Sequence, residues 1–149
     1  MIKESSKGKQ LFSPKDVFNV MKPIFTEKDD IGRLYCIFLN IKNRIIAIEK
    51  MFDGTISHSM VYPREIVKRV IQLKSTAIIL VHNHLSGDPD PSTEDKKVTM
   101  KVGVSLWSMD VKLHDHIIVG DSYHSMADSG YIQKINTRMK EILFAKFNK

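Results

Sequence analysis

Apolar residues along this chain fall into two patterns, short continuous runs and residues spaced three or four apart. The segments Leu34 to Leu39 and Thr76 to Val81 are almost continuously apolar and rich in branched or aromatic side chains. Such short runs predict buried strands. The segment Pro63 to Leu73 instead spaces its apolar residues along one face of a helix. An amphipathic helix directly before a buried strand is typical of a mixed α/β domain.

Start and stop signals define further elements. Ser13 and Pro14 match the N-cap and first position of a short helix. Ser92 matches the N-cap of a longer helix, with Asp95 at its third position. Alternation and spacing of apolar residues predict strands over 44–50 and 110–120 and a last amphipathic helix over 132–147. The expected fold is therefore a single mixed α/β domain.

The segment after the second buried strand carries the candidate chemistry. His82 and His84 stand two residues apart, and Ser92 and Asp95 follow in the pattern H-x-H-x7-S-x2-D. On an extended backbone both imidazoles project from the same face. The intervening SGDPDP is dense in turn residues and can bring Asp95 beside them. Two imidazoles and a carboxylate are the ligands of a catalytic zinc with one open position for water, so we expect one zinc per chain.

This spacing resembles the motif of the JAMM (MPN-plus) metalloproteases. In that motif the residues matching His82, His84 and Asp95 bind zinc, and the residue matching Ser92 lies beside the metal-bound water. The segments YPREIVKRV, AIILVHNH, SGDPDPSTED and HDHIIVGD resemble, more narrowly, the RadC family of bacterial JAB domains. This resemblance implies the MPN/JAB fold, a curved mixed sheet flanked by helices, with Ser92 as a catalytic residue that donates to the developing oxyanion.

The same resemblance sets the expected domain organisation. It assigns residues 13–131 to a RadC-like JAB/MPN domain and leaves 1–12 as a flexible N-terminal tail. Residues 132–149 form a C-terminal amphipathic helix that could mediate self-association. The substrate implied by the resemblance is a peptide or isopeptide.

One position departs from the JAMM pattern. JAMM enzymes carry a glutamate before the first core strand as general base, and alignment on LNIKNRII places it at Gly32. Asp30 shares a face with Gly32 on an extended backbone, but it is displaced by roughly 6.6 Å. Asp29 and Glu27 are weaker alternatives, and the simpler interpretation is that all three acids are solvated. Loss of a general base typically costs about 10²–10⁴-fold in rate, so the chain can bind zinc and still catalyse poorly.

The run His114-Asp115-His116 raises the question of a second metal site. His114 and His116 are expected on one strand face, with Asp115 opposite. The family pattern has Asp-His at the last two positions, and we favour a buried hydrogen-bonding role, because most buried polar groups are simply satisfied. His116 could also support the zinc site indirectly. His58 and His124 lie in polar turns and give no signal.

Composition narrows the remaining choices. No apolar run approaches the roughly 18 residues needed to span a membrane, and the N-terminus lacks the apolar region of a secretory signal. The single cysteine, Cys36, cannot form an intrachain disulfide, which favours a cytoplasmic location. A net charge of +6 permits contact with nucleic acid, but no dense basic run supports it.

Three functions follow, in order of preference. The first is a zinc-dependent metallohydrolase, a metallopeptidase or isopeptidase that uses a zinc-activated water. The second is a zinc-binding scaffold or interaction domain with weak or no catalysis, because the general-base position is Gly32. The third, an association with DNA repair, rests on the RadC name alone.

Overall fold

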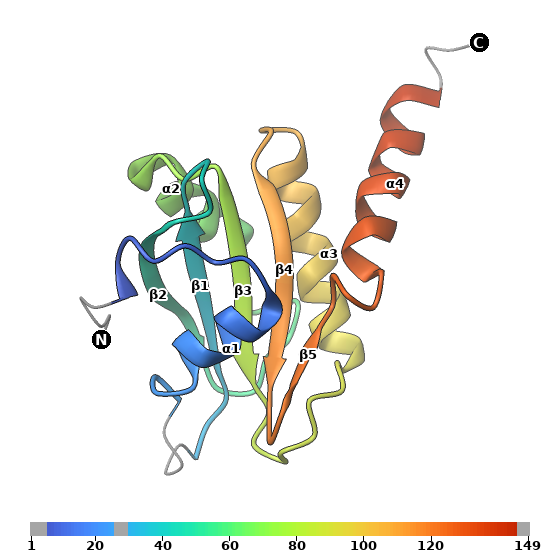
Figure 1. Ribbon diagram of the computed structural model, residues 1–149. Helices are drawn as coiled ribbons and strands as arrows, with labels where there is room; N and C mark the ends of the chain where they lie inside the picture. Colours follow the sequence, from blue (N-terminus) through green and yellow to red (C-terminus); the bar gives the residue numbers. More distant parts are fainter. Residues whose placement is uncertain (1–5, 26–29, 146–149) are drawn as a thin grey trace.

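A mixed sheet with the strand order β2-β1-β3-β4-β5 forms the centre of the protein (Figure 1). The computed structural model describes residues 6–25 and 30–145. In chain order the elements are α1 (Pro14–Met21), β1 (Arg33–Leu39), β2 (Ile45–Asp53), α2 (Pro63–Leu73), β3 (Ala77–Asn83), α3 (Thr93–Trp107), β4 (Lys112–Val119), β5 (Tyr123–Ser125) and α4 (Tyr131–Phe144). The mixed α/β fold expected from the sequence is confirmed.

The central strand β3 explains the layering of the domain. Each of its seven residues is buried, and it pairs antiparallel with β1 and parallel with β4. Helix α1 lies on one face of the sheet, while α2 and α3 cover the other (Figure 1). Side chains on β3 alternate between the two resulting cores: Ile78 and Leu80 pack toward α3, and Ile79 and Val81 pack toward α1. His82, next in this alternation, therefore belongs to the α3 face.

The predicted helix starts are confirmed, and those of α1 and α3 have side-chain caps. The Ser13 side chain accepts a hydrogen bond from the Asp16 amide at the start of α1. Helix α2 begins at Pro63, and α3 begins at Thr93 directly after its cap Ser92, as the sequence predicts. Helix α4 ends at Phe144, whereas the prediction extends to 147, whose last two residues lie outside the described part of the chain.

The described part of the N-terminal segment differs from the predicted flexible tail. Gly8 donates its amide to the Ile45 carbonyl, the Ile45 amide donates to Lys9, and Leu11 donates to Asn43. Leu11 is also buried among the residues of the α1-side core. Backbone pairing at the start of β2 accounts for this difference, because it satisfies edge-strand groups that would otherwise face water.

Two features at the C-terminal side were not predicted or only partly predicted. Strand β5, absent from the sequence prediction, pairs antiparallel with β4. Helix α4 buries Ile132 and Ile135 near its start, but its far end projects beyond the body of the domain (Figure 1) and exposes Ile142, Leu143 and Phe144. Within the described residues, no helix is both long enough and apolar enough to cross a membrane.

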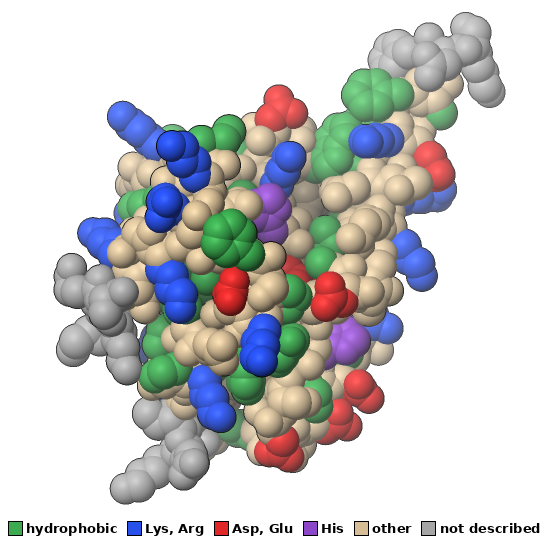
Figure 2. All heavy atoms as spheres, in the orientation of Figure 1, with side chains coloured by type: hydrophobic (Ala, Val, Ile, Leu, Met, Phe, Trp, Pro, Cys, Tyr) green, Lys and Arg blue, Asp and Glu red, His purple; other side chains and the backbone are tan. Residues whose placement is uncertain are grey.

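Basic side chains do not form one continuous patch on the face shown in Figure 2. Lysine and arginine side chains are spread over its left, centre and right, and hydrophobic and acidic side chains lie between them (Figure 2). This distribution adds no support to the weak nucleic-acid prediction.

Candidate metal centre

Strand β3 brings the two predicted histidines together. His82 is buried within the strand, and His84 follows its last residue, where the His84 amide donates to the Val119 carbonyl on β4. The two imidazole rings lie with their centroids 5.1 Å apart and their planes at 84°. The predicted common orientation of the two side chains is therefore observed.

Helix α3 supplies the carboxylate through its cap. The Ser92 hydroxyl accepts the Asp95 amide at 3.0 Å, and the Asp95 carboxylate accepts the Ser92 amide at 2.8 Å, which completes a capping box. The predicted N-cap role of Ser92 is confirmed. Because the Ser92 hydroxyl acts as acceptor in the cap, its own proton remains able to donate elsewhere.

The Asp95 carboxylate joins both histidines. Its Oδ1 lies 2.9 Å from His82 Nδ1, and its Oδ2 lies 2.8 Å from His84 Nε2. Burial opposes ionisation of Asp95, but hydrogen bonds from His82, His84 and the Ser92 amide outweigh it and hold the pKa of this carboxyl well below its ordinary value. A buried, charged carboxylate thus sits between two imidazole nitrogens.

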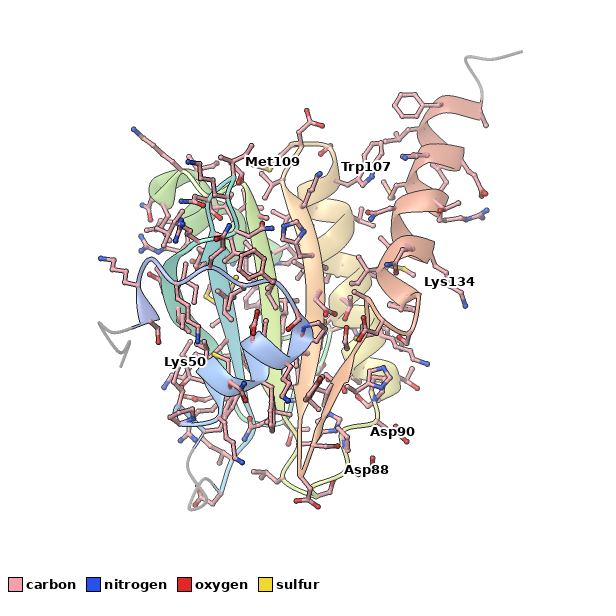
Figure 3. All side chains as sticks on the ribbon, viewed as in Figure 1. Lys50, Asp88, Asp90, Trp107, Met109 and Lys134 are labelled. Carbon is pink, nitrogen blue, oxygen red and sulfur yellow. The ribbon has the colours of Figure 1, made fainter. Side chains whose placement is uncertain are left out.

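His84 is oriented by its second ring nitrogen. Nδ1 lies 2.9 Å from the backbone carbonyl of Asp88. Asp88 belongs to the loop between β3 and α3, from which it and Asp90 point outward (Figure 3). The hydrogen bond to Asp95, against the effect of burial, raises the pKa of His84. A histidine whose Nδ1 donates to a backbone carbonyl is fixed to present Nε2 as a metal ligand.

Another histidine, His116 on β4, enters the cluster from the interior. It is fully buried, and ligand atoms of His82, Asp95 and His116 all lie within 4.8 Å of one another. Its Nδ1 lies 2.6 Å from the hydroxyl of Thr99 on α3, while its Nε2 has no hydrogen-bond partner among the described residues. The compact trio of donors is therefore not the predicted one, although both trios share His82 and Asp95.

The residues present fit a divalent metal. Nitrogen and carboxylate donors are the ligands that zinc prefers. In this site imidazole nitrogens face the charged Asp95 carboxylate, and the buried Nε2 of His116 has no partner in the described part of the chain. A cation would satisfy both features.

The general-base position lies at this cluster and carries no side chain. A Cβ placed on Gly32 would be 3.4 Å from His82 Nε2 and 3.0 Å from the Gly54 carbonyl oxygen. Asp30, the predicted substitute, is exposed to solvent. The other two candidate acids, Asp29 and Glu27, lie outside the described residues.

The His114-Asp115-His116 run does not behave as a regular strand. A register shift in the pairing of β3 with β4 falls between Ile78 and Ile79, opposite Leu113 and Asp115. His114 Nε2 lies 3.0 Å from Asn43 Oδ1, in the turn before β2. His116 instead contacts Thr99 on α3. This bulge corrects the expectation that His114 and His116 share a face, and both have the hydrogen-bonding role that we favoured.

Asp115 joins β4 to β5 near the candidate metal centre. Its carboxylate accepts the Ser125 hydroxyl at 2.5 Å and the amides of His116 and Ala127, each at 2.8 Å. Burial raises the pKa of Asp115 despite these bonds. This carboxylate thereby ties β4 to β5 and to the turn that follows.

Replacing Asp115 with alanine is expected to lower the free energy of unfolding by about 3 kcal/mol, because several buried donors lose their acceptor. Urea denaturation of the purified variant measures this loss. Asp128→Ala, which changes an exposed acid nearby, is the matched control. A loss below about 0.5 kcal/mol for Asp115→Ala, as is usual at the surface, would contradict the assigned role.

Sequence reasoning raised only an indirect role for His116 and missed its closeness to Asp95, and it missed the strand position of His124. His116 lies close to Asp95 because α3 packs against β4, and no local sequence pattern predicts that packing. His124 was placed in a polar turn, but it lies on β5, and its Nε2 is buried without a partner among the described residues. Its pairing partner, Ile118, faces the same core as His116.

Known proteins resemble this chain over the region that contains the site. A family model described as "RadC-like JAB domain" matches residues 11–131. A UPF0758 protein of Thiobacillus denitrificans (strain ATCC 25259 / T1) is 40% identical over 126 residues, which cover 84% of this chain and 56% of the relative. Another, from Coxiella burnetii (strain Dugway 5J108-111), is 47% identical over 98 residues, 65% of this chain and 44% of the relative.

The chain spans about half the length of these curated relatives, and their names state no activity. The matched region includes the histidine pair, Ser92, Asp95 and the glycine at the base position. The chain therefore belongs to the RadC-like JAB domain family.

Proposed function

We propose that this protein is a zinc-dependent hydrolase of amide bonds, in a peptide or an isopeptide. The observation that carries the proposal is the Asp95 carboxylate, which faces an imidazole nitrogen with each of its oxygens. Zinc bound there would supply an activated water and polarise a carbonyl group.

Each residue of the motif has a defined task in this proposal. His82, His84 and Asp95 would hold the ion, and the Asp88 carbonyl would keep the His84 ring in position. Ser92, exposed at the start of α3, would donate its hydroxyl proton to the carbonyl oxygen of the substrate as negative charge develops there.

Substrate has a route to the site beside His84. A cavity of about 340 Å³ reaches this side chain from the α1 side of the sheet. Its lining combines aromatic, apolar and charged residues: Phe18, Lys22, Phe25, Asn83, His84, Leu85, Gly87, Val119, Gly120 and Asp121. A partly apolar cavity with few charged groups suits a peptide segment.

A second candidate function is a metal-binding interaction domain without useful catalysis. It is favoured by Gly32, because no side chain at that position can accept a proton from water beside His82. On this account the metal would stabilise the fold rather than activate water. Self-association through α4 is still a prediction, and so is binding of a peptide or of nucleic acid. Any activity of the longer relatives is likewise only a prediction for this chain.

Replacing His84 with glutamine is expected to abolish zinc-dependent hydrolysis, because the substitution removes one of the three predicted metal ligands. The assay incubates zinc-loaded protein with a mixed-sequence peptide library and an isopeptide-linked peptide pair and identifies products by mass spectrometry. His114→Gln, which changes a histidine bonded to Asn43, is the control that should cleave like the wild type. Cleavage that survives both a chelator and His84→Gln would overturn the proposal.

A further inference from the structure

His116 lies between the sheet and the first two turns of α3. It pairs with Leu80 across the parallel β3–β4 ladder and is fully buried. Asp95 and Thr99 stand four residues apart on α3, on the same face of the helix, and both are fully buried. His116 therefore faces the same helical surface that carries the Asp95 carboxylate.

The hydrogen bonds of Thr99 fix the tautomer of His116. The Thr99 hydroxyl lies 2.6 Å from the Asp95 backbone carbonyl and 2.6 Å from His116 Nδ1. A carbonyl can only accept, so the single hydroxyl proton goes to it, and Thr99 must accept a proton from His116. Nδ1 of His116 therefore carries hydrogen, and Nε2 of the neutral ring carries an exposed lone pair.

Nothing among the described residues uses that lone pair. Nε2 of His116 is buried and has no hydrogen-bond partner there, although buried polar atoms are nearly always paired. Burial lowers the pKa of His116 to about 3. A ring nitrogen of His116 and one ligand atom each of His82 and Asp95 lie within 4.8 Å of one another.

We propose that His116 binds the metal directly through Nε2, as a third imidazole beside those of His82 and His84. The inference rests on the metal binding proposed above and does not require hydrolysis. A neutral histidine with Nδ1–H fixed by a protein oxygen and Nε2 unpartnered has the arrangement of a metal ligand. Thr99 is the positioning residue that holds this arrangement.

Four protein ligands change the character of the site. With His116 added to His82, His84 and Asp95, protein residues alone could supply the ligands of the ion, as in structural zinc sites. Such a site would favour the second candidate function, the metal-binding interaction domain, over the hydrolase. A closed site of this kind agrees with the absence of a side chain at Gly32.

The test uses the wild-type protein labelled with ¹⁵N and loaded with ¹¹³Cd²⁺ in place of zinc. A one-bond coupling between cadmium and a ring nitrogen identifies each ligating histidine in the NMR spectrum. We expect coupling at the ring nitrogens of His82, His84 and His116. Coupling at His82 and His84 without His116 would overturn this inference and leave metal binding intact. Failure to bind cadmium or zinc at all would overturn the proposed function itself.

Variants provide a second measurement. Thr99→Val removes the acceptor of the His116 Nδ1 proton with little change in shape, and it should weaken zinc binding about 10–100-fold in a chelator competition. His124→Gln changes a neighbouring half-buried histidine and should leave the zinc affinity unchanged. Equal affinity for wild type and Thr99→Val, in a folded protein, would contradict the positioning role.

Discussion

Replacing Gly32 with glutamate is expected to raise the rate of peptide hydrolysis by the zinc-loaded protein about 10²–10⁴-fold, the usual contribution of a general base. A Cβ at this position would lie 3.4 Å from His82 Nε2, so a carboxylate built on it reaches the space beside the histidine cluster. There it can take a proton from the attacking water. Initial rates with any peptide cleaved by the wild type measure the gain.

Two further substitutions at Gly32 isolate the carboxylate. Gly32→Gln has nearly the same shape without the acid, and Gly32→Ala tests the Cβ alone, which would lie 3.0 Å from the Gly54 carbonyl oxygen. Only the glutamate variant should gain activity. Equal gains for glutamine would refute the role of the base. No gain in a folded, zinc-loaded glutamate variant would refute the expectation that a carboxylate at position 32 serves as general base.

Replacing Asp95 with asparagine is expected to reduce bound zinc from about one ion per chain to a trace, because the site loses its only charged ligand. The carboxylate contacts both His82 and His84, so its removal also frees these two rings from their present positions. Asparagine keeps the size of the side chain and can still accept the Ser92 amide in the helix cap. Elemental analysis of the purified protein measures the metal content.

A neighbouring acid provides the control for this loss. Glu94 precedes Asp95 in the first turn of α3 and contacts His58 at 2.8 Å instead of the metal centre. Glu94→Gln should retain zinc at the wild-type level. Full zinc content in Asp95→Asn would show that the ion does not bind at this cluster.

Local signals predicted the elements that hold the motif. Ser92 and Asp95 have the residue types and spacing of a helix cap, and the cap forms as expected. The apolar run before His82 predicted a buried strand, and β3 extends only two residues further than expected, to Asn83. Alignment placed the missing base at Gly32, which lies against His82.

Local sequence signals could not predict contacts between segments that are distant in the sequence. His116 reaches Thr99 across 17 residues of sequence because β4 runs parallel to β3 beneath α3, and no periodicity specifies that packing. Strand β5 has three residues, too few for alternation to be distinguished from a polar turn. The bulge that separates His114 from His116 depends on register, which is set by the whole sheet.

A metal bound at Asp95 would couple occupancy of the site to the stability of the folded chain. The same carboxylate fixes the first turn of α3 and faces both histidines, so the complete set of donors exists only when helix and sheet are packed together. An ion that binds only this state adds about 2.7 kcal/mol at a hundredfold excess over its Kd. The melting temperature would then rise with free zinc, and the cellular abundance of the protein would follow zinc supply.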